Sequence, residues 1–226
     1  QETIARAFDF VQHIGKVPIL VRDGNGFFVM RVVRNFIMEG LLLLSEGQHP
    51  AYIRNCSLLA GMAHGPLVLA DQVSLRAVYE NEQRQRALSG ELYAAYAPAF
   101  DIIEAMIKQH QRYGKSAKAG FYDYSASGER GQMWAQLAQF FPLQAPALPK
   151  DDVADRLLFV QILEAARALE EGVIGSSGEA NLGSIYGWGF PAARGGVLQF
   201  INDYGVSEFV ERCDELRARY GERFAT

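Results

Sequence analysis

The chain has 226 residues, of which 49% are hydrophobic and 21% charged, enough to bury one large core or two small ones. Its formal net charge is −4 and no run of five basic residues occurs, which argues against a nucleic-acid-binding surface. Cys56 and Cys213 lie far apart and form no C-x-x-C pair, so free or buried thiols in a reducing compartment are expected.

The first segment, QETIARAFDFVQHIGK, lacks the apolar stretch and the cleavage site of a signal peptide. It also lacks a starting methionine, and we expect it to begin inside a helix of a longer chain. Residues 19–40 then read ILVRDGNGFFVMRVVRNFIMEG, a β-branched run followed by a glycine turn and a long apolar helix. That order is typical of a dinucleotide-binding loop.

The residues of this turn do not complete the dinucleotide fingerprint. Gly24 and Gly26 supply two of the glycines of G-x-G-x-x-G, but Val29 occupies the third position, where a side chain prevents close approach of helix and strand. Glu46, a candidate ribose ligand by distance along the chain, ends a helix rather than a strand. We therefore predict that the turn only starts a helix, and that no residue of this chain binds a cofactor.

Helical periodicity dominates the remaining sequence. The long apolar helix predicted at 27–46 carries Arg31, Arg34 and Glu39, and charges within a membrane span are costly, so we expect a buried helix and no membrane span. Few strands are expected. Gly, Ser and Pro accumulate between residues 113 and 149, which indicates a linker. Further helices are predicted at 50–60, 65–88, 99–112 and, after the helix-start signal Asp151-Asp152, at 153–171.

The two longest predicted helices repeat one another. Their shared residues are separated by a constant 125 positions: Arg31, Glu39, Leu44 and Glu46-Gly47 recur as Arg156, Glu164, Leu169 and Glu171-Gly172. GMAHGPLVLAD at 61–71 is echoed by GFPAARGGVLQFIND at 189–203. We interpret this as duplication of one all-α unit, with a first copy at 1–125, a linker at 126–150 and a second, degenerate copy at 151–226.

Residues that commonly carry chemistry are scattered in this sequence. No histidine pair has the spacing of H-x-x-x-H or H-E-x-x-H, and no G-x-S-x-G elbow occurs. The glycines and aromatics of YGWGFP at 186–191 are best explained by tight packing. We expect no metal site and no catalytic residue in this chain; the histidines so judged are His13, His49, His64 and His110.

Three segments, in this order, resemble the C-terminal helical domain of 3-hydroxyacyl-CoA dehydrogenases: KVPILVRDGNGFFVMR (16–31), GMAHGPLVLADQVSL (61–75) and YGKSAKAGFYDY (113–124). The later segments DRLLFVQILEAARALEEG (155–172) and GWGFPAARGGVLQF (187–200) are similar to the repeat of that domain in multifunctional fatty-acid oxidation proteins. The resemblance covers about residues 10–222 and implies two tandem copies of the helical domain that 6-phosphogluconate dehydrogenase also has at its C-terminus.

Several residues depart from the family pattern. Asn25 stands in the place of a proline, Ala63 and His64 replace the common Pro and Met, and Lys118 replaces a glycine. Met30 occupies the place of an asparagine that contacts substrate in the family.

The resemblance further implies a site at the start of the first long helix. The residues expected to face the substrate cleft are Phe27, Phe28, Met30 and Arg31, although phenylalanines such as Phe27 and Phe28 are more often plain core residues. The family's catalytic His and Glu belong to an NAD-binding domain upstream of Gln1, so the fragment alone is expected to be inactive.

The implied parent is an NAD-dependent L-3-hydroxyacyl-CoA dehydrogenase of fatty-acid β-oxidation, fused to an enoyl-CoA hydratase. It would act on acyl-CoA substrates in the bacterial cytoplasm, with a thiolase subunit as a further partner. The alternative is a non-enzymatic helical module that docks a partner subunit, and the sequence upstream of Gln1 would distinguish the two.

Overall fold

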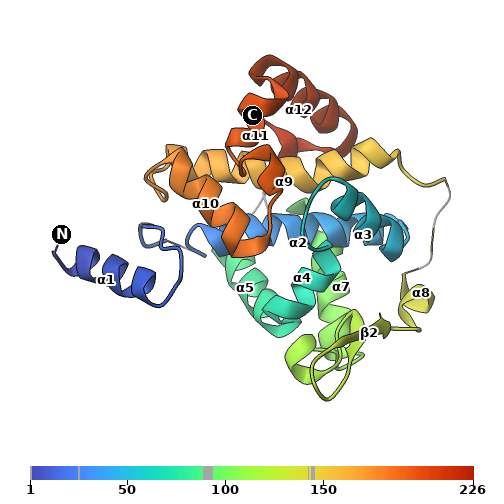
Figure 1. The fold of residues 1–226 in the computed structure, drawn as a ribbon. Coiled ribbons are helices and arrows are strands. Elements are labelled where there is room, and N and C mark those ends of the chain that lie inside the picture. The colour runs from blue at the N-terminus through green and yellow to red at the C-terminus, as the bar shows by residue number, and fades with distance from the viewer. Residues whose placement is uncertain (1, 25, 89–93, 142, 144–145) are drawn as a thin grey trace.

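The computed structural model describes residues 2–24, 26–88, 94–141, 143 and 146–226, so Asn25 lies outside the described residues. The described chain is mostly helical, as predicted (Figure 1). The first half contains α1 (Glu2–His13), α2 (Val29–Ser45), α3 (Pro50–Leu59), α4 (Pro66–Val73), α5 (Leu75–Leu88) and α7 (Ala97–Lys108). The second half contains α9 (Lys150–Glu170), α10 (Ser177–Trp188), η2 (Ala192–Arg194), α11 (Gln199–Tyr204), α12 (Val206–Tyr220) and η3 (Glu222–Phe224).

The two long helices α2 and α9 lie side by side at the centre of the molecule (Figure 1). From Phe36 to Leu44 every residue of α2 is buried. A helix that is apolar on all sides must be covered on all sides. The cover comes from α9 on one flank and from α4, α7 and α10 on the others.

One predicted helix is wrong. The continuous helix expected at 65–88 is two helices, α4 and α5, because the backbone turns sharply at Ser74. Ser74 has φ 87° and ψ 117°, which no helix accommodates, and its Oγ donates to the Tyr113 carbonyl at 3.4 Å. The break turns α5 toward α7, against which it packs.

The weakly patterned segment at 113–149 has structure of its own. It contains the short 3-10 turn η1 (Lys115–Ala117), the strands β1 (Tyr122–Tyr124) and β2 (Arg130–Met133), and α8 (Leu137–Phe140). The two strands pair antiparallel, with Tyr122 opposite Met133.

Asp71 of α4 anchors this hairpin to the helices. Its buried carboxylate accepts hydrogen bonds from the Phe121 and Tyr122 amides, at 2.8 and 3.0 Å, and from Tyr124 Oη at 2.9 Å. A Cβ atom at Gly120 would overlap this carboxylate, so the hairpin can approach α4 only with glycine at that position. Burial raises the pKa of Asp71 to about 6 despite these donors.

Candidate functional site

The start of α2 is a tight turn built on two residues of positive φ. Gly26 has φ 77° and Phe27 has φ 48°, and the Phe27 amide donates to the Gly24 carbonyl at 3.0 Å. Positive φ is normal for glycine but costly for phenylalanine. The turn therefore holds Phe27 in a conformation that an unconstrained chain would avoid.

The four residues expected at this site have different surroundings. Phe27 and Met30 are 52% and 43% exposed. Phe28 is fully buried, with its ring centroid 5.9 Å from that of Trp188 on α10. Arg31 is mostly buried and points toward α9. The structure thus places Phe27 and Met30 on the surface and turns Phe28 and Arg31 inward.

Arg31 joins the start of α2 to α9 through two carboxylates. Its terminal nitrogens donate to both oxygens of Glu171, at 2.5 and 2.9 Å, and its Nε donates to Glu164. Two parallel hydrogen bonds of this kind fix the orientation of the guanidinium group as well as its distance from the carboxylate. The bond from Arg31 holds the pKa of Glu171 below its usual value.

The extended segment before this turn is bound to the second half of the chain. The Leu20 amide donates to Glu179 Oε1 at 3.1 Å, and the Arg22 amide donates to the Val173 carbonyl at 2.9 Å. Val21 forms a β-bridge with Ile174. Residues from both halves of the chain therefore set the position of the turn.

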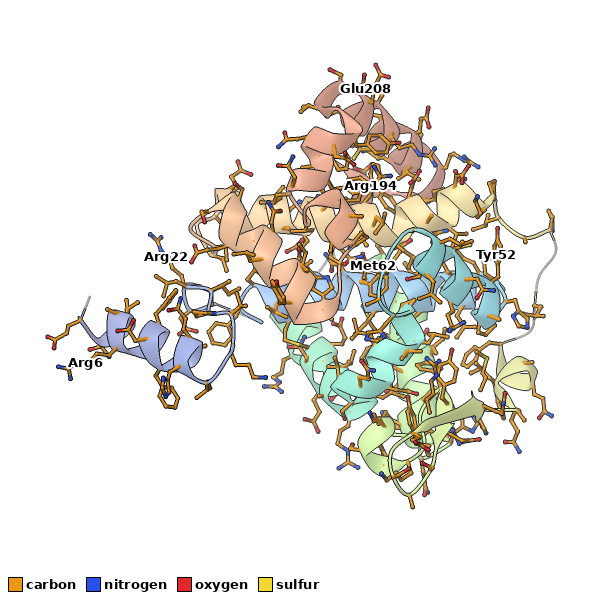
Figure 2. The ribbon with its side chains drawn as sticks, in the orientation of Figure 1. Arg6, Arg22, Tyr52, Met62, Arg194 and Glu208 are labelled. Carbon is orange, nitrogen blue, oxygen red and sulfur yellow. The ribbon has the colours of Figure 1, made fainter. Side chains whose placement is uncertain are left out.

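Apolar side chains gather uncovered along this N-terminal part of the molecule. No residue of α1 is buried, and the helix extends away from the body (Figure 1). Figure 2 shows Arg6 on this protruding helix and Arg22 on the segment that joins it to the body. A run of exposed apolar residues of this kind marks a surface that meets another protein or domain. It comprises Ile4, Phe10, Ile14, Val17, Leu20, Phe27 and Met30.

Other potentially reactive side chains are held in the protein interior. Cys56 and Cys213 are both buried, and burial raises the pKa of Cys213 to about 12, so its thiolate is not formed near neutrality. His110 lies between the rings of Trp134 and Phe140, with ring centroids at 4.9 and 4.1 Å, and its Nε2 has no hydrogen-bond partner among the described residues.

Within the described ranges no three His, Cys, Asp or Glu side chains are placed to hold a metal ion. No described helix is both long and apolar enough to cross a membrane.

A second arginine, Arg156, also forms ion pairs across the α2–α9 contact, and the sequence analysis did not predict this. Arg156 is completely buried and donates to Glu39 at 2.6 Å and to both oxygens of Glu46, at 2.6 and 2.8 Å. Arg223 adds further donors to Glu39, at 2.6 and 2.9 Å. The 125-residue spacing of arginines and glutamates in the sequence was the signal that could have predicted these pairs.

Comparison with known proteins finds a family match in the first half of the chain. Residues 26–124 match the family described as 3-hydroxyacyl-CoA dehydrogenase, C-terminal domain. The match begins at Gly26, in the turn that carries Phe27 and Met30, and ends at Tyr124 of the hairpin that Asp71 anchors.

Full-length relatives match nearly the whole chain. The fatty acid oxidation complex subunits alpha of Shewanella amazonensis and Shewanella baltica are 31% and 32% identical to it over 99% of its length. The chain spans about a third of the length of these relatives, 31% in both cases.

Two solved structures have the same fold. The 3-hydroxybutyryl-CoA dehydrogenase of Escherichia coli superposes with a TM-score of 0.74 at 18% identity, covering 99% of this chain and 62% of that one. The dehydrogenase part of multifunctional enzyme 1 from Caenorhabditis elegans gives 0.63 at 20% identity, covering 98% and 50%.

Proposed function

We propose that this chain is the substrate-side, C-terminal region of an NAD-dependent L-3-hydroxyacyl-CoA dehydrogenase of fatty-acid oxidation. The observation that carries the proposal is the family match that begins at Gly26, in the turn that leaves the side chains of Phe27 and Met30 exposed. The names of the relatives support fatty-acid oxidation as the setting.

We further propose that the chain is a duplicated helical domain, with copies at 1–125 and 151–226 and a linker at 126–150. The helix order supports this, because α2, α3, α4 and α5 are followed later by α9, α10, α11 and α12. Equivalent turns also share conformation: Gly47 and Gly172 have φ 78° and 71°, and Ser74 and Gly205 have φ 87° and 97°.

The contacts between the proposed copies are reciprocal. Arg31 binds Glu164 and Glu171, while the residue 125 positions later, Arg156, binds Glu39 and Glu46. In each contact the arginine of one copy binds two glutamates of the other copy. Two equivalent contacts of this kind are the pattern of a two-fold interface. We therefore propose that the two copies make, within one chain, the contact that two identical domains make in a dimer.

In the proposed enzyme, Phe27 and Met30 face the acyl-thioester, while Phe28 and Arg31 hold the helix start in position. The apolar face of α1 and the turn would pack against the upstream NAD-binding domain and exclude water from the cleft. NAD, bound by that domain, would accept hydride from the 3-hydroxyacyl group, and the catalytic His and Glu would lie there too.

The wider assembly follows from the same proposal. The relatives are called subunits of a complex, which supports a partner subunit, proposed here to be a thiolase. An enoyl-CoA hydratase fused upstream and a place in the bacterial cytoplasm complete the proposal.

The test is NADH formation by the full-length protein that contains this chain, with L- and D-3-hydroxybutyryl-CoA as substrates. We expect turnover of the L-enantiomer alone. The 226-residue chain by itself is expected to show neither turnover nor micromolar NAD binding in a calorimetric titration. An inactive full-length protein that captures a partner subunit would instead support a docking module, and NAD binding by the isolated chain would contradict the proposed division of roles.

A further inference from the structure

A concave site lies apart from the start of α2. It is a pocket of about 340 Å³ between α3, α4, η1 and the β1–β2 hairpin. None of its lining residues belongs to segment 19–31. Three of them are cations, each from a different element: Arg54 of α3, Lys115 of η1 and Arg130 of β2.

These cations have no counter-charge in the part of the chain that the structure describes. The pocket lining includes no Asp or Glu, although the whole chain has 26 acidic and 22 basic residues. Of the acidic residues near the pocket, Asp71 accepts three hydrogen bonds from the hairpin and Asp123 pairs with Arg112 at 2.5 Å. Glu129 lies between the lining residues Gly128 and Arg130 in sequence but is not itself part of the lining. Like charges left together in this way repel one another.

The side chains of Arg54 and Lys115 pass close to glycines of the pocket lining. A Cβ atom at Gly65, which lines the pocket, would lie 3.1 Å from Arg54 Cγ, so the Arg54 stem rests on the start of α4. At Gly128, another lining residue, an added Cβ would lie 3.7 Å from Lys115 Cε and 3.6 Å from Lys118 Nζ. A fourth cation therefore stands at the rim.

Arg130 closes the remaining side of the pocket. Its guanidinium lies over the ring of Tyr122 at 5.3 Å. Burial raises the pKa of Tyr122, and the positive charges of Arg130 and Arg54 oppose that rise. Leu58 and Val68 add apolar surface to the pocket lining.

We propose that this pocket binds a ligand through a diphosphate group. Three cations in one pocket balance more than the single charge of a carboxylate, and the arginine fork matches phosphate oxygens. The volume is at the lower end of the range for small-molecule sites. The ligand's phosphates would contact Arg54, Lys115 and Arg130, and its body would lie on Leu58 and Val68. The proposed group is a terminal diphosphate, which carries more negative charge than the bridging diphosphate of NAD, so the inference does not depend on the proposed dehydrogenase function or on NAD binding by this chain.

The experiment is calorimetric titration of the 226-residue chain with pyrophosphate, ADP and adenosine. The test variant is Lys115→Ala with Arg130→Gln, since both side chains are exposed and their loss leaves the core intact. The charge-matched control is Lys150→Ala with Arg84→Gln, which removes two positive charges from other exposed positions. Circular dichroism melts would establish that both variants fold.

We expect saturable binding of pyrophosphate and ADP, and none of adenosine. The test variant should bind at least tenfold more weakly, and the control within twofold of the original chain. ADP binding tenfold tighter than pyrophosphate would assign the site to a nucleotide, whereas equal affinities would assign it to other phosphorylated compounds. Absence of pyrophosphate binding, binding of adenosine, or equal binding by the test variant and the original chain would overturn the proposal.

Discussion

Replacing Arg156 with methionine should destabilise this protein far more than the same change at Arg31, although both arginines bind two glutamates at the α2–α9 contact. The difference lies in what each replacement leaves behind. Arg156 and Glu39 are both 0% exposed, whereas Arg31 is 21% exposed and its partner Glu171 is 54% exposed. Water can solvate Glu171 after the loss of Arg31, but it cannot reach Glu39.

The magnitude follows from the remaining partners. Removing one member of a buried ion pair typically costs about 3–5 kcal/mol, because the other charge stays buried. Glu39 keeps two contacts from Arg223, and Glu46 is partly exposed, so we place Arg156→Met at the lower end, about 3 kcal/mol. For Arg31→Met we expect about 1 kcal/mol, as for exposed pairs, because Glu164 keeps weaker contacts with Asn35 and Arg167.

Urea unfolding at pH 7, followed by circular dichroism, measures both values. With a slope of about 2–3 kcal/mol per molar urea, the Arg156 variant should shift its midpoint down by about 1–1.5 M and the Arg31 variant by less than about 0.5 M. Equal shifts would refute the reasoning, since they would mean that burial does not decide the cost of the unpaired glutamate.

Three further predictions concern the hairpin and the start of α2. Gly120→Ala should lower the free energy of unfolding by about 1–3 kcal/mol, because its methyl group overlaps the Asp71 carboxylate, whereas Gly24→Ala, which meets no atom within 4 Å, should change it little; equal losses in urea unfolding would contradict this. The raised pKa of Asp71, about 6, means that the folded state binds a proton between pH 6 and 4 that the unfolded state does not. Lowering the pH from 7 to 5 should therefore stabilise the original chain by about 1 kcal/mol relative to Asp71→Asn, and a constant difference between the two unfolding free energies would show that Asp71 does not titrate there. In the full-length enzyme, Met30→Asn should change kcat/KM for 3-hydroxyacyl-CoAs by no more than about tenfold, the value of one hydrogen bond; unchanged kinetics for both Met30→Asn and Met30→Ala, with lowered melting temperatures, would instead make Met30 a structural residue.

The helices were predictable from sequence wherever apolar periodicity was strong. The long helix predicted at 27–46 is α2, at Val29–Ser45, and the one predicted at 153–171 is α9, at Lys150–Glu170. The break at Ser74 was not predictable in this way, because neither neighbour, Val73 or Leu75, is a glycine or a proline that would indicate the end of a helix. The turn depends on the tertiary contact with Tyr113, which local sequence does not reveal.

The candidate site shows the same division between local and tertiary information. The sequence pointed to Phe27 through Arg31 as one cleft-facing group, but a helix start directs successive side chains to different sides. Which of them are covered depends on Trp188 and Glu171, more than 130 residues away in the chain. The basic pocket was equally hidden, since Arg54, Lys115 and Arg130 come together only through the packing of the hairpin on α4.

The central pairing of α2 with α9 has a consequence for how the chain is made. Synthesis reaches the end of α9, at Glu170, only after 125 further residues have followed Ser45, the end of α2. At roughly 5–20 residues per second, α2 waits roughly 6–25 seconds for its main partner helix. Through that interval the side of α2 that α9 will cover is open to water and to other nascent chains. A helix that is buried on all sides in the finished protein is thus the part of the chain most open to aggregation during synthesis.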